Sequence, residues 1–163
     1  MIDFVSPEGT AAGTVVSMLE EAYGALRDAD GARFDAWRRE WQEFDRYVYA
    51  DASLAGNWLF FSHLDGQLVG FVSWDPRKRP VALLGHNCIR PAFQGKGFGL
   101  EQLLHALEIL REQGFEKVLV QTGREDFFTR ARAMYERAGF CLRRNLVLPE
   151  PSGSLVVEYE LML

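Results

Sequence analysis

The sequence contains few cysteines, no long apolar run and no basic excess, and each of these absences excludes a class of protein. Cys88 and Cys141 are the only cysteines among 163 residues, which argues against a disulfide framework and against a cysteine-ligated metal site. No apolar segment approaches the length that would span a bilayer, and the N-terminus lacks the features of a secretory signal. The sequence therefore predicts a cytoplasmic protein with no metal site and no membrane association.

The charge balance also limits the choice of partners. The formal net charge is -5, from 18 lysines and arginines and 23 aspartates and glutamates. A nucleic-acid-binding protein needs a basic surface, so a nucleic-acid partner is not expected. A hydrophobic fraction of 48% and a charged fraction of 25% are ordinary for a globular protein. At this length we expect one domain, spanning residues 1–163.

Apolar periodicity predicts a strand, two helices, a run of strands, and then strands and helices in alternation. Asp65-Gly66 between two apolar runs is a strong signal for a two-residue hairpin turn. Such an order is typical of an α+β fold with a mixed sheet of six or seven strands and helices on both faces. The expected strands are 2–6, 58–64, 67–74, 81–90, 117–120, 140–148 and 155–162, with Pro149 to Ser154 joining the last two; the expected helices have apolar stripes at 12–26, 34–48 and 100–110, and a last helix covers 126–138.

A glycine-rich segment, QGKGFG at residues 94–99, lies between a strand ended by Pro91 and a leucine-rich helix. The first N–H groups of a helix have no internal partner, and glycines let the backbone approach an anion closely. This pattern predicts a phosphate-binding turn, with Lys96 adding positive charge. A dinucleotide fingerprint is excluded because Leu100 occupies the place of its third glycine, and a Walker loop is excluded because no Gly-Lys-Ser/Thr sequence is present.

With these residues the chain resembles the GNAT superfamily of N-acetyltransferases. Gln94, Gly97 and Gly99 match the family motif Q/R-x-x-G-x-G/A, and AMYERAGF at residues 133–140 is similar to the second family signature. The resemblance covers residues 58–148 well, and residues 1–57 only in their order of strand and helices. It implies the GNAT fold, with a mostly antiparallel sheet, in a single N-acetyltransferase domain over residues 1–163.

The resemblance also implies a binding site for acetyl-coenzyme A. The pyrophosphate would lie on the segment from the motif glutamine to the following helix, and pantetheine would run along the preceding strand. That strand separates from its neighbour in the family, so the cofactor supplies the missing partner for its backbone. The implied cofactor-binding residues are Asn87, Cys88, Ile89, Gln94, Gly95, Lys96, Gly97, Phe98, Gly99 and Leu100.

The reaction implied by the resemblance is direct attack of a neutral amine on the thioester. An amide N–H of Ile89 or Cys88 would stabilise the oxyanion, and Tyr135 would protonate the leaving thiolate. Tyr135 has the alternative of a packing role beside neighbouring alanines. His86 is a candidate acceptor of the substrate's proton, with a water chain as the alternative. Cys88 is expected to pack as a small apolar residue, because no activating partner is identifiable.

Two features near the predicted site do not follow from the motifs. Phe128 stands where many relatives carry an asparagine that contacts the cofactor, and residues 123–126 lengthen the preceding loop. The aromatic stripe at 34–44 is expected to be core, with one of Trp37 and Trp41 reaching the substrate pocket.

Two functions remain open from the sequence. The first is acetyl transfer to a primary amine of a small molecule or peptide, and the second is a non-catalytic acyl-coenzyme A sensor with the same fold. Retention of Tyr135 favours the first. The acceptor, the length of the acyl group and the presence of a homodimer are left open.

Overall fold

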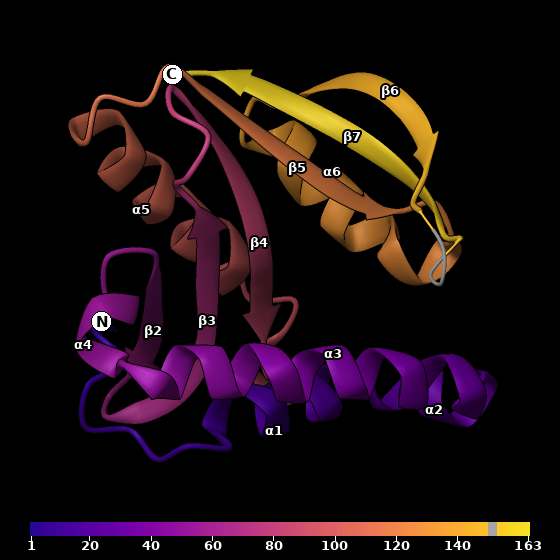
Figure 1. Ribbon diagram of the computed structural model, residues 1–163, viewed down its shortest axis with the longest axis horizontal. Helices are drawn as coiled ribbons and strands as arrows, with labels where there is room; N and C mark the ends of the chain where they lie inside the picture. Colours follow the sequence, from indigo (N-terminus) through magenta and orange to yellow (C-terminus); the bar gives the residue numbers. More distant parts are fainter. Residues whose placement is uncertain (150–152) are drawn as a thin grey trace. The chain divides into compact units, whose positions relative to one another are not determined.

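The computed structural model describes residues 1–149 and 153–163, and the chain divides into two compact units. The first unit comprises residues 1–73 and 86–99, and the second comprises residues 74–85 and 100–163. The elements, labelled in Figure 1, are β1 (Ile2–Val5), α1 (Thr14–Ala22), α2 (Gly24–Ala29), α3 (Gly31–Ala50), α4 (Ala52–Ala55), β2 (Leu59–Leu64), β3 (Gln67–Asp75), β4 (Val81–Ile89), the 3-10 helix η1 (Pro91–Phe93), α5 (Phe98–Glu112), β5 (Lys117–Gly123), the 3-10 helix η2 (Asp126–Phe128), α6 (Thr129–Arg137), β6 (Cys141–Val147) and β7 (Leu155–Met162).

The described residues form seven hydrogen-bonded strands in the order β1-β2-β3-β4-β5-β7-β6. The pairs β1–β2, β2–β3, β5–β7 and β6–β7 are antiparallel, whereas β4 and β5 are parallel. The parallel register joins residues 81–84 to residues 117–120, and β4 continues to Ile89. The predicted α+β class with a mixed, mostly antiparallel sheet is confirmed. The predicted connection at Pro149 to Ser154 falls partly on residues 150–152, outside the described residues.

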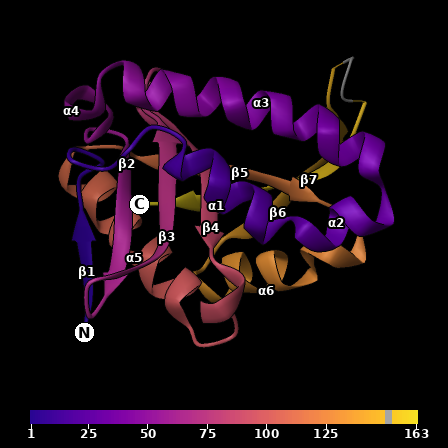
Figure 2. The same cartoon turned by 90° about the horizontal axis from the view of Figure 1, so that it is seen from below.

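The first unit has a core in which α1 and α3 pack on its strands. Figure 2 shows β1, β2 and β3 side by side, as their antiparallel registers require. Burial of large apolar side chains provides most of the stabilisation, at about 25 cal/mol per Å² removed from water. The buried cluster consists of Val15, Met18, Leu19, Phe34, Trp41, Val48, Ala55, Leu59, Phe61, Phe71 and Cys88.

Local sequence signals set the turns and helix starts in this unit. Asp65 and Gly66 both have positive φ, 50° and 79°, as a two-residue hairpin turn demands, which confirms the predicted hairpin. The Asp30 side chain accepts the Arg33 amide at 3.1 Å and so caps α3. At α1 the acceptor comes from α3, because the buried Asp45 carboxylate accepts the amides of Gly13 at 2.9 Å and Val16 at 3.1 Å. Sequence patterns did not identify this cap.

The first predicted helix is two helices. The apolar stripe from residue 12 to residue 26 predicts one helix, but α1 ends at Ala22 and α2 begins at Gly24. Tyr23 between them has φ of -99° and ψ of 15°, outside the helical range. Gly24 has a low helix propensity, so little energy is lost when the chain turns here. The ring of Tyr23 packs on Trp37 and Trp41 of α3, and these contacts stabilise the break between the two helices.

In the second unit, α5 and α6 end as the sequence predicts, at Gly114 and Gly139. These glycines have φ of 82° and 98°, and the amide after each one donates back to the helix, from Phe115 to Leu110 and from Phe140 to Tyr135, both at 3.0 Å. Leu103, Leu107 and Leu110 of α5 are buried, and so are Phe115 and Phe140, the residues that follow the two glycines. Within the described residues, no helix has the length and apolar character that crossing a membrane requires.

Candidate functional site

The glycine-rich loop after β4 has the backbone geometry of an anion-binding turn. Gly95 and Gly97 have φ of 74° and 89°, in the region that favours glycine. Apart from its two chain neighbours, no described residue has an atom within 4 Å of a Cβ added at either position, so the backbone of the loop is open to a ligand. Gly99, by contrast, lies inside the first turn of α5. The loop therefore presents bare backbone at two positions and continues directly into a helix.

The amides of this segment are available to a ligand. None of the N–H groups of residues 95–99 donates to another residue that the structure describes, whereas Gln94 donates to Pro91 at 3.2 Å. The helix that starts at Phe98 adds its partial positive charge at the same place. Consecutive unpaired amides and a helix N-terminus can together hold a phosphate group.

Two amide side chains hold the loop against the end of β4. Gln94 Nε2 donates to the carbonyl oxygen of Ile89 at 2.8 Å. Asn87 Nδ2 donates to the carbonyl oxygen of Gly99 at 3.2 Å, in the first turn of α5. These contacts tie strand, loop and helix start into one piece. The sequence pointed only to the backbone of these residues, although polar side chains beside a glycine-rich turn signal such contacts.

Lys96, the only basic residue of the loop, folds back onto the residues just before the loop. Lys96 Nζ donates to the carbonyl oxygen of Ala92 at 3.0 Å and lies 5.6 Å from the centre of the Phe93 ring. Phe93 in turn contacts the edge of Phe98 at the helix start. No carboxylate among the described residues forms an ion pair with this ammonium, which therefore contributes positive charge near the open amides. Leu100, the last of the predicted cofactor-binding residues, is the first residue of the second unit and is half-buried in α5.

Cys88 is a packing residue of the first unit, as expected. Its side chain is 5% exposed, and its thiol donates to the carbonyl oxygen of Met18 at 3.7 Å. Burial, with a smaller effect of Glu21, raises the pKa of the Cys88 thiol to about 12. A thiol with this pKa is neutral at pH 7 and a poor nucleophile.

His86 lies on β4 between aromatic rings of α3 and β3. Its ring centre is 4.9 Å from that of Phe44 and 5.9 Å from that of Phe71, and its amide donates to Ser73 Oγ at 3.0 Å. Burial lowers the pKa of His86 to about 4. The imidazole is therefore neutral at pH 7, which allows it to accept a hydrogen bond, but it is too weak a base to hold a proton taken from an ammonium group.

The lowered pKa of His86 predicts acid sensitivity. Between pH 6.5 and pH 4 the unfolded chain binds a proton at this histidine and the folded chain does not, so stability is lost as the pH falls through this window. We expect the loss to be on the order of 3 kcal/mol in the free energy of unfolding. Urea unfolding of the wild type and of His86→Asn at pH 7 and pH 4.5 measures it. The variant should lose less stability on acidification, and parallel losses would show that His86 does not cause the effect.

The aromatic stripe of α3 is mainly core. Trp41 is 5% exposed, Trp37 is partly buried, and both rings pack on Tyr23 at 5.0 and 5.6 Å. Arg33 also packs on Trp37, with its guanidinium carbon 4.5 Å from the ring centre. The α3 ring that contacts β4 is instead that of Phe44, in the later part of the helix, which packs on His86. That one of Trp37 and Trp41 reaches a substrate stays a prediction.

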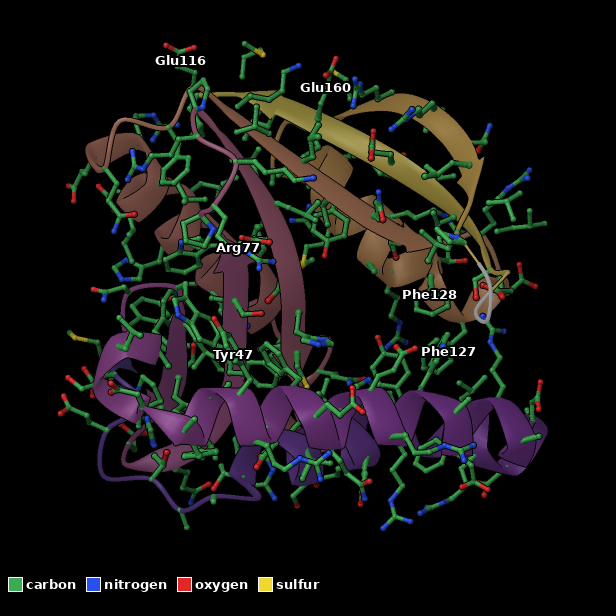
Figure 3. The ribbon with its side chains drawn as sticks, in the orientation of Figure 1. Tyr47, Arg77, Glu116, Phe127, Phe128 and Glu160 are labelled. Carbon is green, nitrogen blue, oxygen red and sulfur yellow. The ribbon has the colours of Figure 1, made fainter. Side chains whose placement is uncertain are left out.

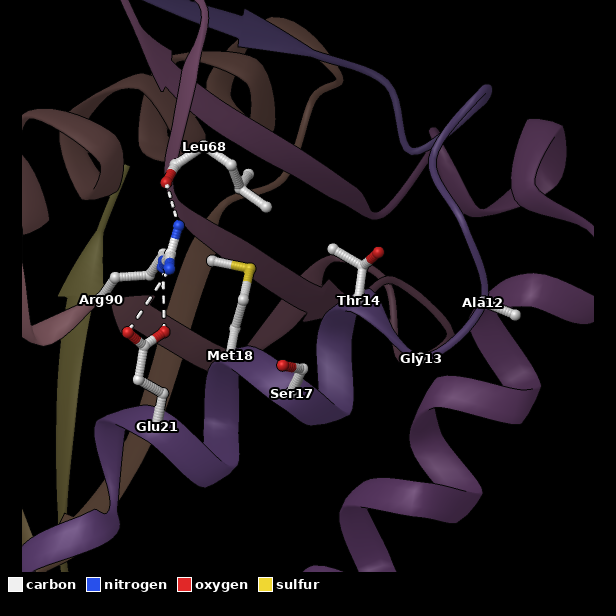
Figure 4. A pocket seen from close by; sticks show the side chains of 8 residues that line it. All are labelled: Ala12, Gly13, Thr14, Ser17, Met18, Glu21, Leu68 and Arg90. Atoms are coloured by element: carbon white, nitrogen blue, oxygen red, sulfur yellow. Dashed lines mark hydrogen bonds and ion pairs between the residues drawn. The ribbon is translucent and has the colours of Figure 1, made fainter.

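A hollow of about 430 Å³ lies on the first unit, beside the start of α1 (Figure 4). Two of the residues that line this hollow form an ion pair, from Arg90 Nε to Glu21 at 2.9 Å. Arg90 also donates to the carbonyl oxygen of Leu68, a third lining residue, at 3.3 Å. Its lining includes neither His86 nor any residue of the glycine-rich loop. The arginine that follows β4 thus anchors α1 to the strand end. The lining residues are Ala12, Gly13, Thr14, Ser17, Met18, Glu21, Leu68 and Arg90.

Tyr135 lies in α6 of the second unit and is 5% exposed. Its ring centre is 5.6 Å from that of Phe140 and 6.4 Å from that of Tyr159. The aromatic neighbours and the Phe140 amide bonded to the Tyr135 carbonyl fix the position of the ring at the helix end. A phenol held in this way can serve as a proton donor with little reorganisation.

The loop before α6 is built around Phe128, the residue at which the sequence was expected to depart from the family pattern. A methyl group added at Gly123 would overlap the Phe128 ring, and Phe127 packs edge-on against that ring at 5.0 Å (Figure 3). Arg132 donates to the carbonyl oxygens of Gly123 at 2.7 Å and Glu125 at 3.0 Å. The Phe128 ring and the Arg132 guanidinium therefore fix the conformation of this loop.

Comparisons with known proteins agree with the motifs. The profile described as the acetyltransferase (GNAT) family matches residues 19–140. A search of curated proteins finds no match. Among solved structures, an acetyltransferase assigned to the GNAT family from Desulfovibrio desulfuricans is 19% identical, with a TM-score of 0.77 over 99% of each chain. PaiA N-acetyltransferase from Thermoplasma acidophilum, in complex with coenzyme A, is 16% identical, with a TM-score of 0.69 over 97% of this chain and 98% of that chain. The ribosomal-protein-S18-alanine N-acetyltransferase of Escherichia coli is 17% identical, with a TM-score of 0.64 over 99% of this chain and 94% of that chain.

Proposed function

The chain belongs to the GNAT family of acetyltransferases, and from this we propose that it transfers the acetyl group of acetyl-coenzyme A to a primary amine of a small molecule or peptide. The observation that carries the proposal is the loop after β4. The amides of residues 95–99 donate no hydrogen bond to any residue that the structure describes. They lie beside open space at two glycines of positive φ and at the start of a long helix. A structural neighbour in complex with coenzyme A supports the choice of donor.

The residues present fit the donor in two respects. The pyrophosphate would be held by the backbone from Gln94 to Gly99, with Lys96 nearby, and this loop contains no carboxylate to repel it. Pantetheine would be held by the backbone of Asn87, Cys88 and Ile89, in the part of β4 that continues beyond its register with β5. When bound, acetyl-coenzyme A supplies an acetyl group on a thioester.

In the proposed reaction the amine nitrogen forms a bond to the carbonyl carbon, and the carbon–sulfur bond breaks. The amide of Ile89 or Cys88 donates to the carbonyl oxygen as negative charge develops on it, a contribution of about 10²–10³ in rate for one such donor. Tyr135 gives its hydroxyl proton to the departing sulfur and regains a proton from solvent. A phenol near pH 10 and a thiol near 8.5 are close enough for this transfer.

His86 is assigned the role of hydrogen-bond acceptor for the amine. A histidine with a pKa of about 4 is neutral at pH 7 and can orient an N–H group without carrying its proton away. The proton that the amine loses would then leave through water, which was the alternative open from the sequence. This assignment limits the expected effect of His86→Asn to roughly 10-fold in kcat/KM, well below that of losing a general base.

Binding of the donor should be visible as stabilisation. A ligand that binds only the folded chain, at a hundredfold excess over its Kd, stabilises by about 2.7 kcal/mol. We therefore expect acetyl-coenzyme A to raise the Tm of the wild type by several degrees, because this gain in stability is a large fraction of that of a small domain. Thermal unfolding with and without the ligand measures the shift. An unchanged Tm at saturating ligand would contradict donor binding altogether.

The catalytic part of the proposal is tested by supplying acetyl-coenzyme A with a panel of primary amines. Release of coenzyme A thiol above the rate without amine, together with acetylated amine in the mass spectrum, is the expected result. Saturable binding of the donor without turnover of any amine would instead identify the chain as a non-catalytic acyl-coenzyme A sensor.

A further inference from the structure

The hollow beside α1 lies wholly within the first unit, and its size suits a small molecule. Its volume of about 430 Å³ falls in the range of roughly 300–1,000 Å³ that is usual for ligand sites. None of its lining residues is among those proposed to hold acetyl-coenzyme A or the acceptor amine. The hollow is therefore a candidate binding site in addition to the one proposed for the donor.

Arg90 has two unused hydrogen-bond donors in this hollow. An arginine side chain carries five N–H donors. Arg90 Nε and Nη2 donate to Glu21 at 2.9 and 3.4 Å, and Nη1 donates to the carbonyl oxygen of Leu68 at 3.3 Å. With respect to the described residues, one N–H on Nη1 and one on Nη2 therefore have no acceptor. Two N–H groups of one guanidinium can hold a carboxylate.

Glu21 and Ser17 provide further unused hydrogen-bonding capacity. The Glu21 carboxylate is 41% exposed, and Arg90 fills two of its roughly four acceptor positions. Ser17 precedes Glu21 by four residues on α1, so the two lie on one face of the helix, and its hydroxyl forms no hydrogen bond with any described residue. The amides at the start of α1 are less available, because the Asp45 carboxylate already accepts two of them.

The two charges of the hollow select for a ligand that carries both signs. An anion alone would meet the Glu21 carboxylate beside Arg90, and a cation alone would meet the Arg90 guanidinium beside Glu21. A molecule with a carboxylate and an ammonium on one carbon places each charge next to its opposite. The large apolar side chains of the lining are Met18 and Leu68, and Met18 lies between the ion pair and Thr14 in Figure 4.

From these contacts we infer that the hollow binds a free α-amino acid with an aliphatic side chain. The carboxylate of the ligand accepts hydrogen bonds from the two unused N–H groups of Arg90 and from the Ser17 hydroxyl. Its ammonium donates to Glu21, and its side chain packs on Met18 and Leu68. The end of a peptide carries only one of the two charges on its terminal residue, so the lining favours the free amino acid.

The binding test compares L-leucine with two analogues that each lack one charge. L-Leucinamide keeps the ammonium without the carboxylate, and 4-methylpentanoate keeps the carboxylate without the ammonium. Calorimetry of the full chain at pH 7 should show saturable binding of leucine and a Kd at least about 10-fold weaker for each analogue, because hydrogen bonds between charged groups are the stronger ones. Absence of saturable leucine binding, or equal Kd values for the three compounds, would overturn the inference.

Two substitutions assign each charge of the ligand to its partner. Glu21→Gln should weaken leucine by about 10-fold without weakening 4-methylpentanoate, which has no ammonium to lose a partner. Arg90→Gln should weaken leucine by about 10-fold without weakening leucinamide, which has no carboxylate. A substitution that only disturbed the packing of α1 would weaken leucine and the analogue alike, and that result would contradict the assignment.

Ser17→Ala and Glu20→Gln complete the test. Ser17→Ala removes no hydrogen bond to a described residue, so the fold should be kept while leucine binding weakens by about 3-fold. Glu20→Gln is the matched control, because Glu20 is the neighbouring residue of α1 and pairs with Arg38 at 2.7 Å outside the hollow. The Kd for leucine should be unchanged in Glu20→Gln, and a loss equal to that in Glu21→Gln would reject the hollow as the binding site.

Discussion

Tyr135→Phe should lower kcat by about 100-fold or more while leaving the affinity for acetyl-coenzyme A almost unchanged. The substitution removes only the hydroxyl proton and keeps the ring that packs on Phe140 and Tyr159. The lost interaction develops as negative charge builds on sulfur, so it affects the transition state and not the ground state. Initial rates at saturating donor and amine, with the Kd for coenzyme A from calorimetry, measure the two quantities separately.

The matched control is Tyr159→Phe, which deletes a hydroxyl from a ring in contact with Tyr135. The Tyr159 hydroxyl donates to Glu136 at 3.1 Å, so its loss should cost about 1 kcal/mol of stability and leave kcat near that of the wild type. If Tyr135→Phe turns over at the wild-type rate while chemistry limits turnover, Tyr135 is a packing residue and solvent protonates the thiolate.

Gly97→Ala should weaken coenzyme A binding by at least about 100-fold. The added methyl group would occupy the open space beside the loop, where the phosphate is proposed to sit and where, chain neighbours apart, no described residue has an atom within 4 Å. An L residue at φ of 89° is also strained, which shifts the amides away from a common focus. Calorimetric titration with coenzyme A measures the loss, and thermal unfolding of the same sample reports the cost in stability.

Gly66→Ala controls for the strain alone. Gly66 has φ of 79°, it also has no atom within 4 Å of an added Cβ, and it lies in the β2–β3 turn of the same unit. The two variants should lose similar stability, on the order of 1–2 kcal/mol, whereas only Gly97→Ala should lose affinity. Equal affinities in the two variants would mean that the loop at Gly97 does not hold the cofactor.

Much of the fold could be predicted because local chemistry determined it. The Asp65-Gly66 turn and the helix ends at Gly114 and Gly139 are short-range features, and each glycine adopts the positive φ that its position requires. The break at Tyr23 could not be predicted, since it depends on packing against tryptophans that are distant in sequence. The cap of α1 by Asp45 was missed for the same reason, because the acceptor comes from another helix.

In the candidate site, too, local features could be predicted from the sequence and contacts between distant residues could not. The glycine-rich loop that we propose to hold the phosphates could be recognised from glycine spacing, since backbone conformation is its main requirement. The side-chain contacts of Asn87 and Gln94, and the packing of the Phe44 ring on His86, depend on how separate segments of the chain meet after folding. The lowered pKa of His86 follows from its burial, so a sequence pattern alone could suggest a base but not its weakness.

The most direct test of the account is the response of individual backbone amides to coenzyme A. In a titration followed by amide NMR of the isotope-labelled protein, the account predicts that the largest chemical-shift changes fall on the amides of residues 95–99, with a second group on residues 87–89. The same titration with Gly97→Ala should show neither group at equal ligand concentration. Saturable binding that leaves the amides of residues 95–99 unshifted would contradict the central claim that this loop holds the cofactor.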